Sequence, residues 1–193
     1  MAPARRDLWW AAGATAVLVL TAALAARHRA APGEALVFGL VNDIPGAAVD
    51  PVKVFMTLGT VTGVVLVAAV AGVATMRIGP PLAVLGAGLV ARFTTPLLKD
   101  LIERSRPDRL VAGVHVRERP GGFGFPSSHT SIAVAVAVVV ACCFPKLRWP
   151  ALALAALVAL ARMYVGVHLP LDLLGGAALG LLAAAPFVLA LRR

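Results

Sequence analysis

Six side chains that can bind phosphate or move protons lie beside the apolar segments of this 193-residue chain. They are Lys99, Arg106, His129, Arg162, His168 and Asp172. A charge near the middle of a membrane helix costs roughly 2.5–3.5 kcal/mol on insertion scales, so such a set predicts a functional site. Arginine and lysine bind phosphate oxygens, and a histidine held by a carboxylate can act as a nucleophile. The sequence therefore predicts phosphate chemistry on a lipid.

The segment from Arg162 to Asp172 carries the strongest of these signals. His168 and Asp172 are four residues apart across a predicted helix start, which is close enough for a hydrogen bond. The carboxylate would fix the tautomer of the imidazole and leave the other ring nitrogen free to attack. Arg162 would hold phosphate oxygens with its forked guanidinium. A buried polar trio that satisfies only itself is the alternative.

Lys99 and Arg106 form the second part of the predicted site. They are seven residues apart, so on a continuing helix they would share one face, two turns apart. Pro107 would end that helix directly after Arg106 and fix the direction of its guanidinium. A basic cluster that only contacts lipid headgroups is the alternative for this segment taken alone.

The run Pro126-Ser127-Ser128-His129 is typical of a loop that enters a helix. Ser127 or Ser128 would cap the helix, and the free N–H groups there, with the serine hydroxyls, would bind an anion. His129 in the first turn could donate a proton to a group bound at this point. An ordinary helix cap with an interfacial histidine is the alternative.

Hydrophobic residues make up 60% of the chain, more than a soluble domain contains. We expect an all-α fold, with residues 1–193 forming one integral membrane domain that is a six-transmembrane-helix bundle. The predicted spans are 8–26, 54–76, 78–98, 128–144, 149–167 and 170–191. A cleaved signal peptide is the alternative for the first span, which we expect to be retained. A short helix over 34–41 would lie on the membrane interface.

The basic residues of the short connectors predict the orientation of the bundle. With both termini in the cytoplasm, the positive-inside bias is satisfied by Arg5, Arg6, Arg77, Lys146, Arg148, Arg192 and Arg193. The candidate site then lies at the extracytoplasmic face of the cell membrane. The formal net charge of +9 is spread over loops rather than a basic tail. This favours the membrane and a lipid phosphate as partners, and not nucleic acid, while no oligomeric state is predicted.

No metal ion or other cofactor is expected at the site. Two-metal phosphatases hold their ions with several carboxylates, and only Asp172 lies at the predicted site. The nearby acids Asp100, Glu103 and Asp108 are mixed with cations. Fixed lysine and arginine side chains can supply the charge stabilisation that magnesium would otherwise supply.

The pattern resembles the type 2 phosphatidic acid phosphatase (PAP2) family, membrane lipid phosphatases that share a site plan with vanadium haloperoxidases. That family carries three motifs, K-x6-R-P, P-S-G-H and S-R-x5-H-x3-D. The corresponding segments here, in order and with the spacings intact, are 99–107, 126–129 and 161–172. Ser128 stands where the family has glycine, and Ala161 stands where it usually has serine. Serine at 128 strains any backbone geometry that requires glycine, but adds a donor.

The resemblance implies a six-helix bundle with a haloperoxidase-like active-site core, and a role for each matching residue. His168 is implied to be the nucleophile that forms a phosphohistidine, Asp172 to orient it, and His129 to protonate the leaving group. The residues implied to bind the phosphoryl group and its surroundings are Lys99, Arg106, Pro126, Ser127, Ser128 and Arg162.

The implied function is metal-independent hydrolysis of a lipid phosphomonoester or pyrophosphate. An outward-facing site in a small chain favours polyprenyl (undecaprenyl-type) pyrophosphate, with phosphatidic acid or phosphatidylglycerophosphate as the alternative. A lipid phosphotransferase that uses the same histidine is a further alternative. A transporter is disfavoured because its charges would follow a path, and a haloperoxidase because the chain is membrane-embedded.

The loop over 108–125 is a candidate reader of a second phosphate. Phe123 and Phe125 would dip into the membrane interface, and the side chains that would contact a second phosphate are Arg109, His115, Arg117 and Arg119. This hypothesis would make the loop a gate for diphosphate substrates.

Overall fold

The computed structural model describes residues 5–46, 49–119 and 121–192, with side chains from residue 9 onward, and over these residues it contains helices and no strand. The α-helices are α1 (Arg5–Ala25), α2 (Glu34–Asn42), α3 (Val49–Met56), α4 (Val61–Thr75), α5 (Gly79–Ile102), α6 (Pro107–Leu110), α7 (Ser128–Cys143), α8 (Arg148–Tyr164) and α9 (Pro170–Leu191). Two short 3₁₀ helices are η2 (Thr57–Gly59) and η3 (Pro145–Leu147). The prediction of an all-α fold is confirmed.

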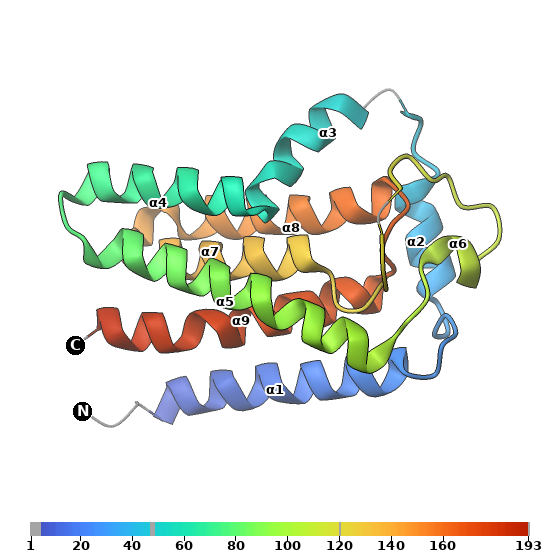
Figure 1. Cartoon of the computed structure of the whole chain (residues 1–193), viewed down its shortest axis with the longest axis horizontal. Helices are drawn as coiled ribbons and strands as arrows, with labels where there is room; N and C mark the ends of the chain where they lie inside the picture. Colours follow the sequence, from blue (N-terminus) through green and yellow to red (C-terminus); the bar gives the residue numbers. More distant parts are fainter. Residues whose placement is uncertain (1–4, 47–48, 120, 193) are drawn as a thin grey trace.

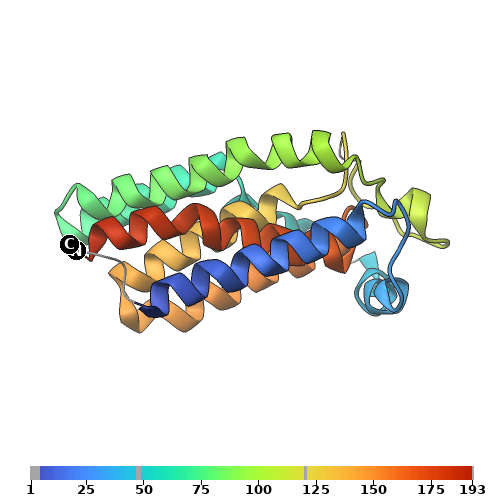
Figure 2. The ribbon, with the colours of Figure 1, turned by 90° about the horizontal axis from the view of Figure 1, so that it is seen from below.

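Helices α1, α4, α5, α7, α8 and α9 run lengthwise in a bundle (Figures 1 and 2). Helix α7 packs against α5, α8 and α9, while α1 packs on α9 and α4 on α5. Helices α2 and α6 lie beyond one end of the bundle, and α1 begins and α9 ends at the opposite end (Figure 1). The ends of α5 and α8 and the starts of α7 and α9 therefore meet beside α2.

Small side chains form the centre of the bundle and let the helices approach closely. Val84, Ala87, Ala135, Val139 and Ala184 are completely buried. A Cβ at Gly180 of α9 would lie 2.5 Å from the carbonyl oxygen of Ser131 in α7, so only glycine fits there. Membrane helices associate through close van der Waals packing of this kind.

The predicted spans agree with the helices except at the second one. Helix α9 covers the predicted 170–191, and α2 forms where the interfacial helix is expected. The span predicted over 54–76 is wrong as one continuous helix, because α3–η2 and α4 are bent by 67° at their junction. Thr60 has extended backbone there and caps α4 by accepting from the N–H of Gly63 at 3.4 Å.

The helices have the length and composition of membrane segments. Among the described residues, Gly79–Leu110, Pro145–Tyr164 and Pro170–Leu191 are long and apolar enough to cross a membrane, and the bent pair Val49–Gly59 and Val61–Thr75 makes a fourth candidate. Trp9–Ala25 and Ser128–Cys143 are apolar but shorter, so the count of six crossings stays a prediction. Large apolar side chains such as Val70, Phe93 and Leu97 are more than two-thirds exposed on the outer surface, as in a membrane protein.

We predict that Gly180→Ala lowers the free energy of unfolding by about 1–3 kcal/mol, because the added methyl group overpacks the contact between α7 and α9. Thermal unfolding of the purified protein in detergent measures the change. Gly13→Ala in α1 is the control, because nothing lies within 4 Å of a Cβ there, and it should leave the melting temperature unchanged or slightly higher. Equal melting temperatures for the two variants would contradict the packing described here.

Candidate active site

The structure brings polar side chains from four helices to the end of the bundle that carries α2. Lys99 lies in the last turn of α5, His129 in the first turn of α7 and Arg162 in the last turn of α8. His168 precedes α9, and Asp172 lies in its first turn. Because these segments converge in the fold, residues up to 73 positions apart in the sequence surround one region.

His168 contacts a carboxylate on one side of its ring and a guanidinium on the other. Its Nδ1 lies 3.3 Å from Oδ2 of Asp172, and its Nε2 lies 3.1 Å from Nη1 of Arg106. An arginine can only donate, so this network assigns the proton to Nδ1 and a lone pair to Nε2. That tautomer leaves Nε2 as the nucleophilic nitrogen.

The surroundings of His168 keep its ring uncharged. Burial lowers the pKa of His168 well below its usual value of 6.5, and the nearby positive charges of Arg106, Lys99 and Arg162 lower it further. The side chain is almost completely buried, and His129 also lies close enough to act electrostatically on it. The imidazole is therefore neutral at physiological pH, which a nitrogen nucleophile requires.

Local helix chemistry fixes Asp172. It is the third residue of α9, and its Oδ2 accepts from the backbone N–H of Leu169, the cap residue, at 2.9 Å. Pro170 begins the helix, as predicted, where its missing N–H has no cost. The backbone carbonyl of Asp172 accepts from the N–H of Ser127 at 2.9 Å, which ties the start of α7 to the start of α9.

The prediction that Lys99 and Arg106 share one continuing helix is wrong. Helix α5 ends at Ile102, and Glu103 takes a left-handed conformation with φ 51°. Arg106 is extended (φ −75°, ψ 162°), as a residue before proline tends to be, and Pro107 begins α6 instead of ending α5. Alternate residues of an extended chain point the same way, so Arg104 and Arg106 both reach the start of α9.

Lys99 and Arg106 hold the glycine-rich loop that precedes α7. Nζ of Lys99 donates to the carbonyls of Phe123 (2.5 Å) and Gly124 (3.2 Å). Arg106 donates from Nε to Gly122 O (3.1 Å) and from Nη2 to Gly121 O (3.0 Å). The two cations thus lie side by side around the loop, and an incoming phosphate would share or replace these carbonyl acceptors.

The start of α7 agrees with the prediction of a helix cap. Ser127 is the cap residue, is fully buried, and its Oγ accepts from the N–H and the hydroxyl of Thr130 at 3.5 and 3.0 Å. Ser128 and His129 follow in the first turn and are half-buried, whereas Pro126 is buried and brings no polar side-chain group. The backbone N–H groups of Ser128 and His129 precede the one that Ser127 caps and can bind an anion.

Arg162 is buried and is paired with an acid that the sequence analysis missed. Its Nη1 donates to both carboxylate oxygens of Glu118, at 3.0 and 3.1 Å. Its Nε is buried and has no hydrogen-bond partner among the described residues, so this donor remains for an anion. Glu118 had no signal in the sequence, since it lies alone in a mixed loop 44 residues from its partner.

Arg104 and Glu34 are two further charged residues that sequence reasoning missed. Arg104 is completely buried and bridges Asp172 of α9 and Glu34 of α2. The sequence did contain two signals for this pair. Glu34 is a single acid at the start of an apolar helix, and Arg104 is a third basic residue in the segment that contains Lys99 and Arg106.

The loop over 108–125 differs from its predicted role at two positions. Arg117 stacks on the Tyr164 ring at 4.5 Å and donates to the carbonyls of Asn42, Ile44 and Tyr164, so it ties the loop to the bundle. Phe125 is completely buried, and its ring fills the space above Gly175, so the expectation that it dips into the interface is wrong. Arg119 is exposed.

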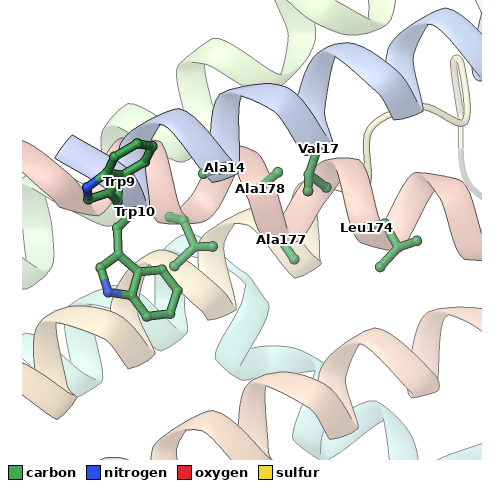
Figure 3. Close-up of a pocket in the computed structure, with 9 residues that line it drawn as sticks. Trp9, Trp10, Ala14, Val17, Leu174, Ala177 and Ala178 are labelled. Carbon is green, nitrogen blue, oxygen red and sulfur yellow. The ribbon is translucent and has the colours of Figure 1, made fainter. Parts of the chain in front are cut away.

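Two other features bear on what could bind. Within the parts of the chain that the structure describes, no group of three or more His, Cys, Asp and Glu side chains could hold a metal ion. A groove of about 640 Å³ between α1 and α9 (Figure 3) is lined by Trp9, Trp10, Gly13, Ala14, Val17, Leu174, Ala177, Ala178 and Leu181. This lining has no titratable side chain, so the polar end of the bundle is the candidate active site.

Comparison with known sequences connects this geometry to named proteins. Phosphatidylglycerophosphatase B of Bacillus subtilis is 38% identical over 103 residues, which is 47% of this chain and 48% of that protein. The lipid A 4'-phosphatase of Bacteroides thetaiotaomicron is 38% identical over 93 residues (43% and 40%), and the undecaprenyl-diphosphatase of Sulfolobus acidocaldarius is 33% identical over 103 residues (50% and 50%). The chain matches about half the length of these relatives.

Solved structures have the same fold. A transmembrane PAP2 type phosphatidylglycerolphosphate phosphatase from Bacillus subtilis matches with a TM-score of 0.70 and 24% identity, over 93% of this chain and 95% of that one. LpxE of Aquifex aeolicus matches with a TM-score of 0.67 and 24% identity, over 81% and 93%. Residues 80–193, which include the four helices that meet at the polar end, match the family described as the PAP2 superfamily, and the chain therefore belongs to that superfamily.

Proposed function

We propose that this chain is an integral membrane phosphatase that hydrolyses a phosphomonoester or pyrophosphate of a lipid through a phosphohistidine on His168. The observation that carries the proposal is the buried imidazole whose Nδ1 faces Asp172 and whose Nε2 faces Arg106. Three cations surround it, and a phosphoryl group is the species that such an arrangement stabilises best.

The proposed reaction has two displacements at phosphorus. Nε2 of His168 attacks phosphorus, the bond to the leaving oxygen breaks, and His129 protonates that oxygen. Water then attacks the phosphohistidine, gives a proton to His129 and releases inorganic phosphate, which restores the free imidazole. Lys99, Arg106 and Arg162 hold the phosphoryl oxygens, together with Ser127, Ser128 and the N–H groups at the start of α7.

Polyprenyl pyrophosphate of the undecaprenyl type is the proposed substrate. A relative named undecaprenyl-diphosphatase supports this choice, and exposed Arg119 on the loop before α7 can contact a second phosphate. The similarity to a phosphatidylglycerophosphatase favours phosphatidylglycerophosphate or phosphatidic acid as the second candidate. Transfer of the phosphoryl group to a second lipid instead of water uses the same first step.

We also propose that the site faces the extracytoplasmic side and that both termini are cytoplasmic. Basic residues at the end of the bundle opposite the site support this orientation through the positive-inside bias. The substrate tail then stays in the outer leaflet while the phosphate reaches the cations.

We predict that His168→Ala lowers phosphate release by at least about four orders of magnitude, as expected when a covalent nucleophile is lost. The assay uses purified protein, a panel of lipid mono- and diphosphates and EDTA in every reaction. His28→Asn is the control, since that ring is exposed and asparagine tolerates the left-handed backbone there. Full activity of His168→Ala, or loss of wild-type activity in EDTA, would contradict the proposal.

Release of free phosphate from one pure lipid in detergent separates a hydrolase from a phosphotransferase.

The pH profile of kcat/KM gives a second test. A lowered pKa means that His168 stays unprotonated as the pH falls, so its acid limb should lie well below pH 6.5. Arg106→Gln removes one of the charges that lower the pKa of His168 and should move this limb to higher pH, while burial keeps it below the ordinary value. Comparing both proteins on one substrate cancels the titration of the substrate. A limb that stays in place or moves to lower pH would be inconsistent with this electrostatic account.

Glu118 competes with phosphate for Arg162, because a carboxylate and a phosphate bind the same guanidinium donors. We predict that Glu118→Gln tightens inhibition by inorganic phosphate roughly three- to tenfold, the scale of a partly exposed ion pair. Asp50→Asn, a change at an almost fully exposed acid of α3, is the control and should leave inhibition unchanged. Weaker inhibition in Glu118→Gln would mean that the carboxylate orients Arg162 rather than competing with phosphate.

A further inference from the structure

Arg104 is a completely buried arginine that the proposed reaction does not use. Its Nη1 donates to Oδ1 of Asp172 at 2.8 Å and to Oε1 of Glu34 at 3.3 Å, and its Nη2 donates to Oε2 of Glu34 at 2.5 Å. One cation therefore joins two buried carboxylates from α9 and α2. Burying a charged side chain has a large desolvation cost. Each of these three charges is therefore stable in the interior only while its partners are present.

Glu34 is itself held on every side. Its Oε1 also accepts from the backbone N–H of Leu171 at 2.9 Å, and its Oε2 accepts from the N–H of Ala31 at 2.8 Å. Only 5% of the residue is exposed. Because Leu171 directly precedes Asp172, Glu34 binds the first turn of α9 twice, once through the backbone and once through Arg104.

The two oxygens of Asp172 are divided between two tasks. Oδ1 faces Arg104, while Oδ2 accepts from Leu169 N–H at 2.9 Å and faces Nδ1 of His168 at 3.3 Å. A guanidinium on Oδ1 stabilises the ionised form of the carboxylate and fixes its rotation, so Oδ2 presents a charged acceptor to the imidazole. Without Arg104, Glu34 and Asp172 would be two like charges in one buried region.

We propose that Arg104 and Glu34 are positioning residues, which keep Asp172 ionised and aimed at Nδ1 of His168. This inference rests on the proposed function, since it assigns a role in the phosphohistidine step. A buried ion pair adds little net stability compared with apolar packing, so anchoring α2 alone does not require this arrangement. The contact chain Glu34–Arg104–Asp172–His168 links α2 to the nucleophile.

The test is a double-mutant cycle at Glu34 and Arg104, with kcat and KM measured on one lipid phosphate. Loss of a supporting hydrogen-bond partner typically lowers activity about 10- to 100-fold. We expect Glu34→Gln alone to lower kcat about tenfold and Arg104→Met about 100-fold, each with KM nearly unchanged. In the Arg104→Met background, Glu34→Gln should instead raise kcat several-fold, because it removes the repulsion between the two carboxylates.

A positioning role changes kcat of the folded protein, whereas a structural role changes only its stability. If the pair only anchors α2, the variants should have lower melting temperatures while the folded protein keeps wild-type kcat. Glu103→Gln and Arg27→Met are the controls, because both side chains are exposed and neither belongs to the site, and they should keep wild-type kcat. Thermal unfolding of each variant in detergent identifies folded protein.

The ring nitrogens of His168 provide a second readout. The chain has four histidines, so a ¹⁵N-histidine spectrum of the protein in detergent is sparse enough to follow one of them. In Glu34→Gln and Arg104→Lys, which keep polar groups in place, we expect a smaller fraction of the Nδ1–H tautomer of His168 than in the wild type. If Arg104→Met does not fold, these two variants decide the question.

The outcomes distinguish this inference from the function on which it rests. If His168→Ala is inactive while every variant of Glu34 and Arg104 has wild-type kcat and an unchanged tautomer, the positioning role alone is overturned. If His168→Ala keeps full activity, the phosphohistidine proposal fails, and the positioning role fails with it.

Discussion

The contact between Asp172 and Nδ1 of His168 is the interaction on which the rest of the site depends. It places the ring proton on Nδ1, toward the carboxylate, and leaves the lone pair of Nε2 facing Arg106. The fold supplies this contact through a local device, since the carboxylate also caps the helix that begins between the two residues. The same carboxylate oxygen therefore caps α9 and orients the imidazole.

Positive charge is concentrated around this neutral ring by the ends of helices. Lys99 and Arg162 come from the last turns of α5 and α8, and Arg106 comes from the extended chain beyond α5. The carbonyls of the glycine-rich loop and the carboxylate of Glu118 supply acceptors for these donors. A phosphoryl group brings oxygens that match the same donors, which is why the proposed chemistry follows from the arrangement.

Much of the bundle could be predicted from the sequence, because long apolar runs and helix-start signals depend on local composition. Helix α9, which Pro170 begins, and the Ser127 cap of α7 are examples. The bend at Thr60 was missed because residues 54–59 before it and 61–75 after it are all uncharged, so the sequence carries no mark of the break. The end of α5 was missed because Glu103 adopts a left-handed conformation that usually belongs to glycine.

Only the contacts of the site between residues close together in the sequence could be predicted. His168 and Asp172 are four residues apart, and their contact follows from that distance. Glu34 and Arg104 are 70 residues apart, and their pairing depends on how α2 docks against the start of α9, which no short-range pattern records. The same reason explains why Arg117 serves the bundle rather than a headgroup, since its three carbonyl acceptors come from distant segments.

An experimental structure of the protein with bound vanadate, an analogue of a phosphoryl group in transfer, tests the central claim most directly. The account predicts vanadium within bonding distance of Nε2 of His168, with its oxygens contacted by Lys99, Arg106 and Arg162 and by the N–H groups at the start of α7. Vanadate bound elsewhere, or held by the cations with His168 turned away, would contradict the account.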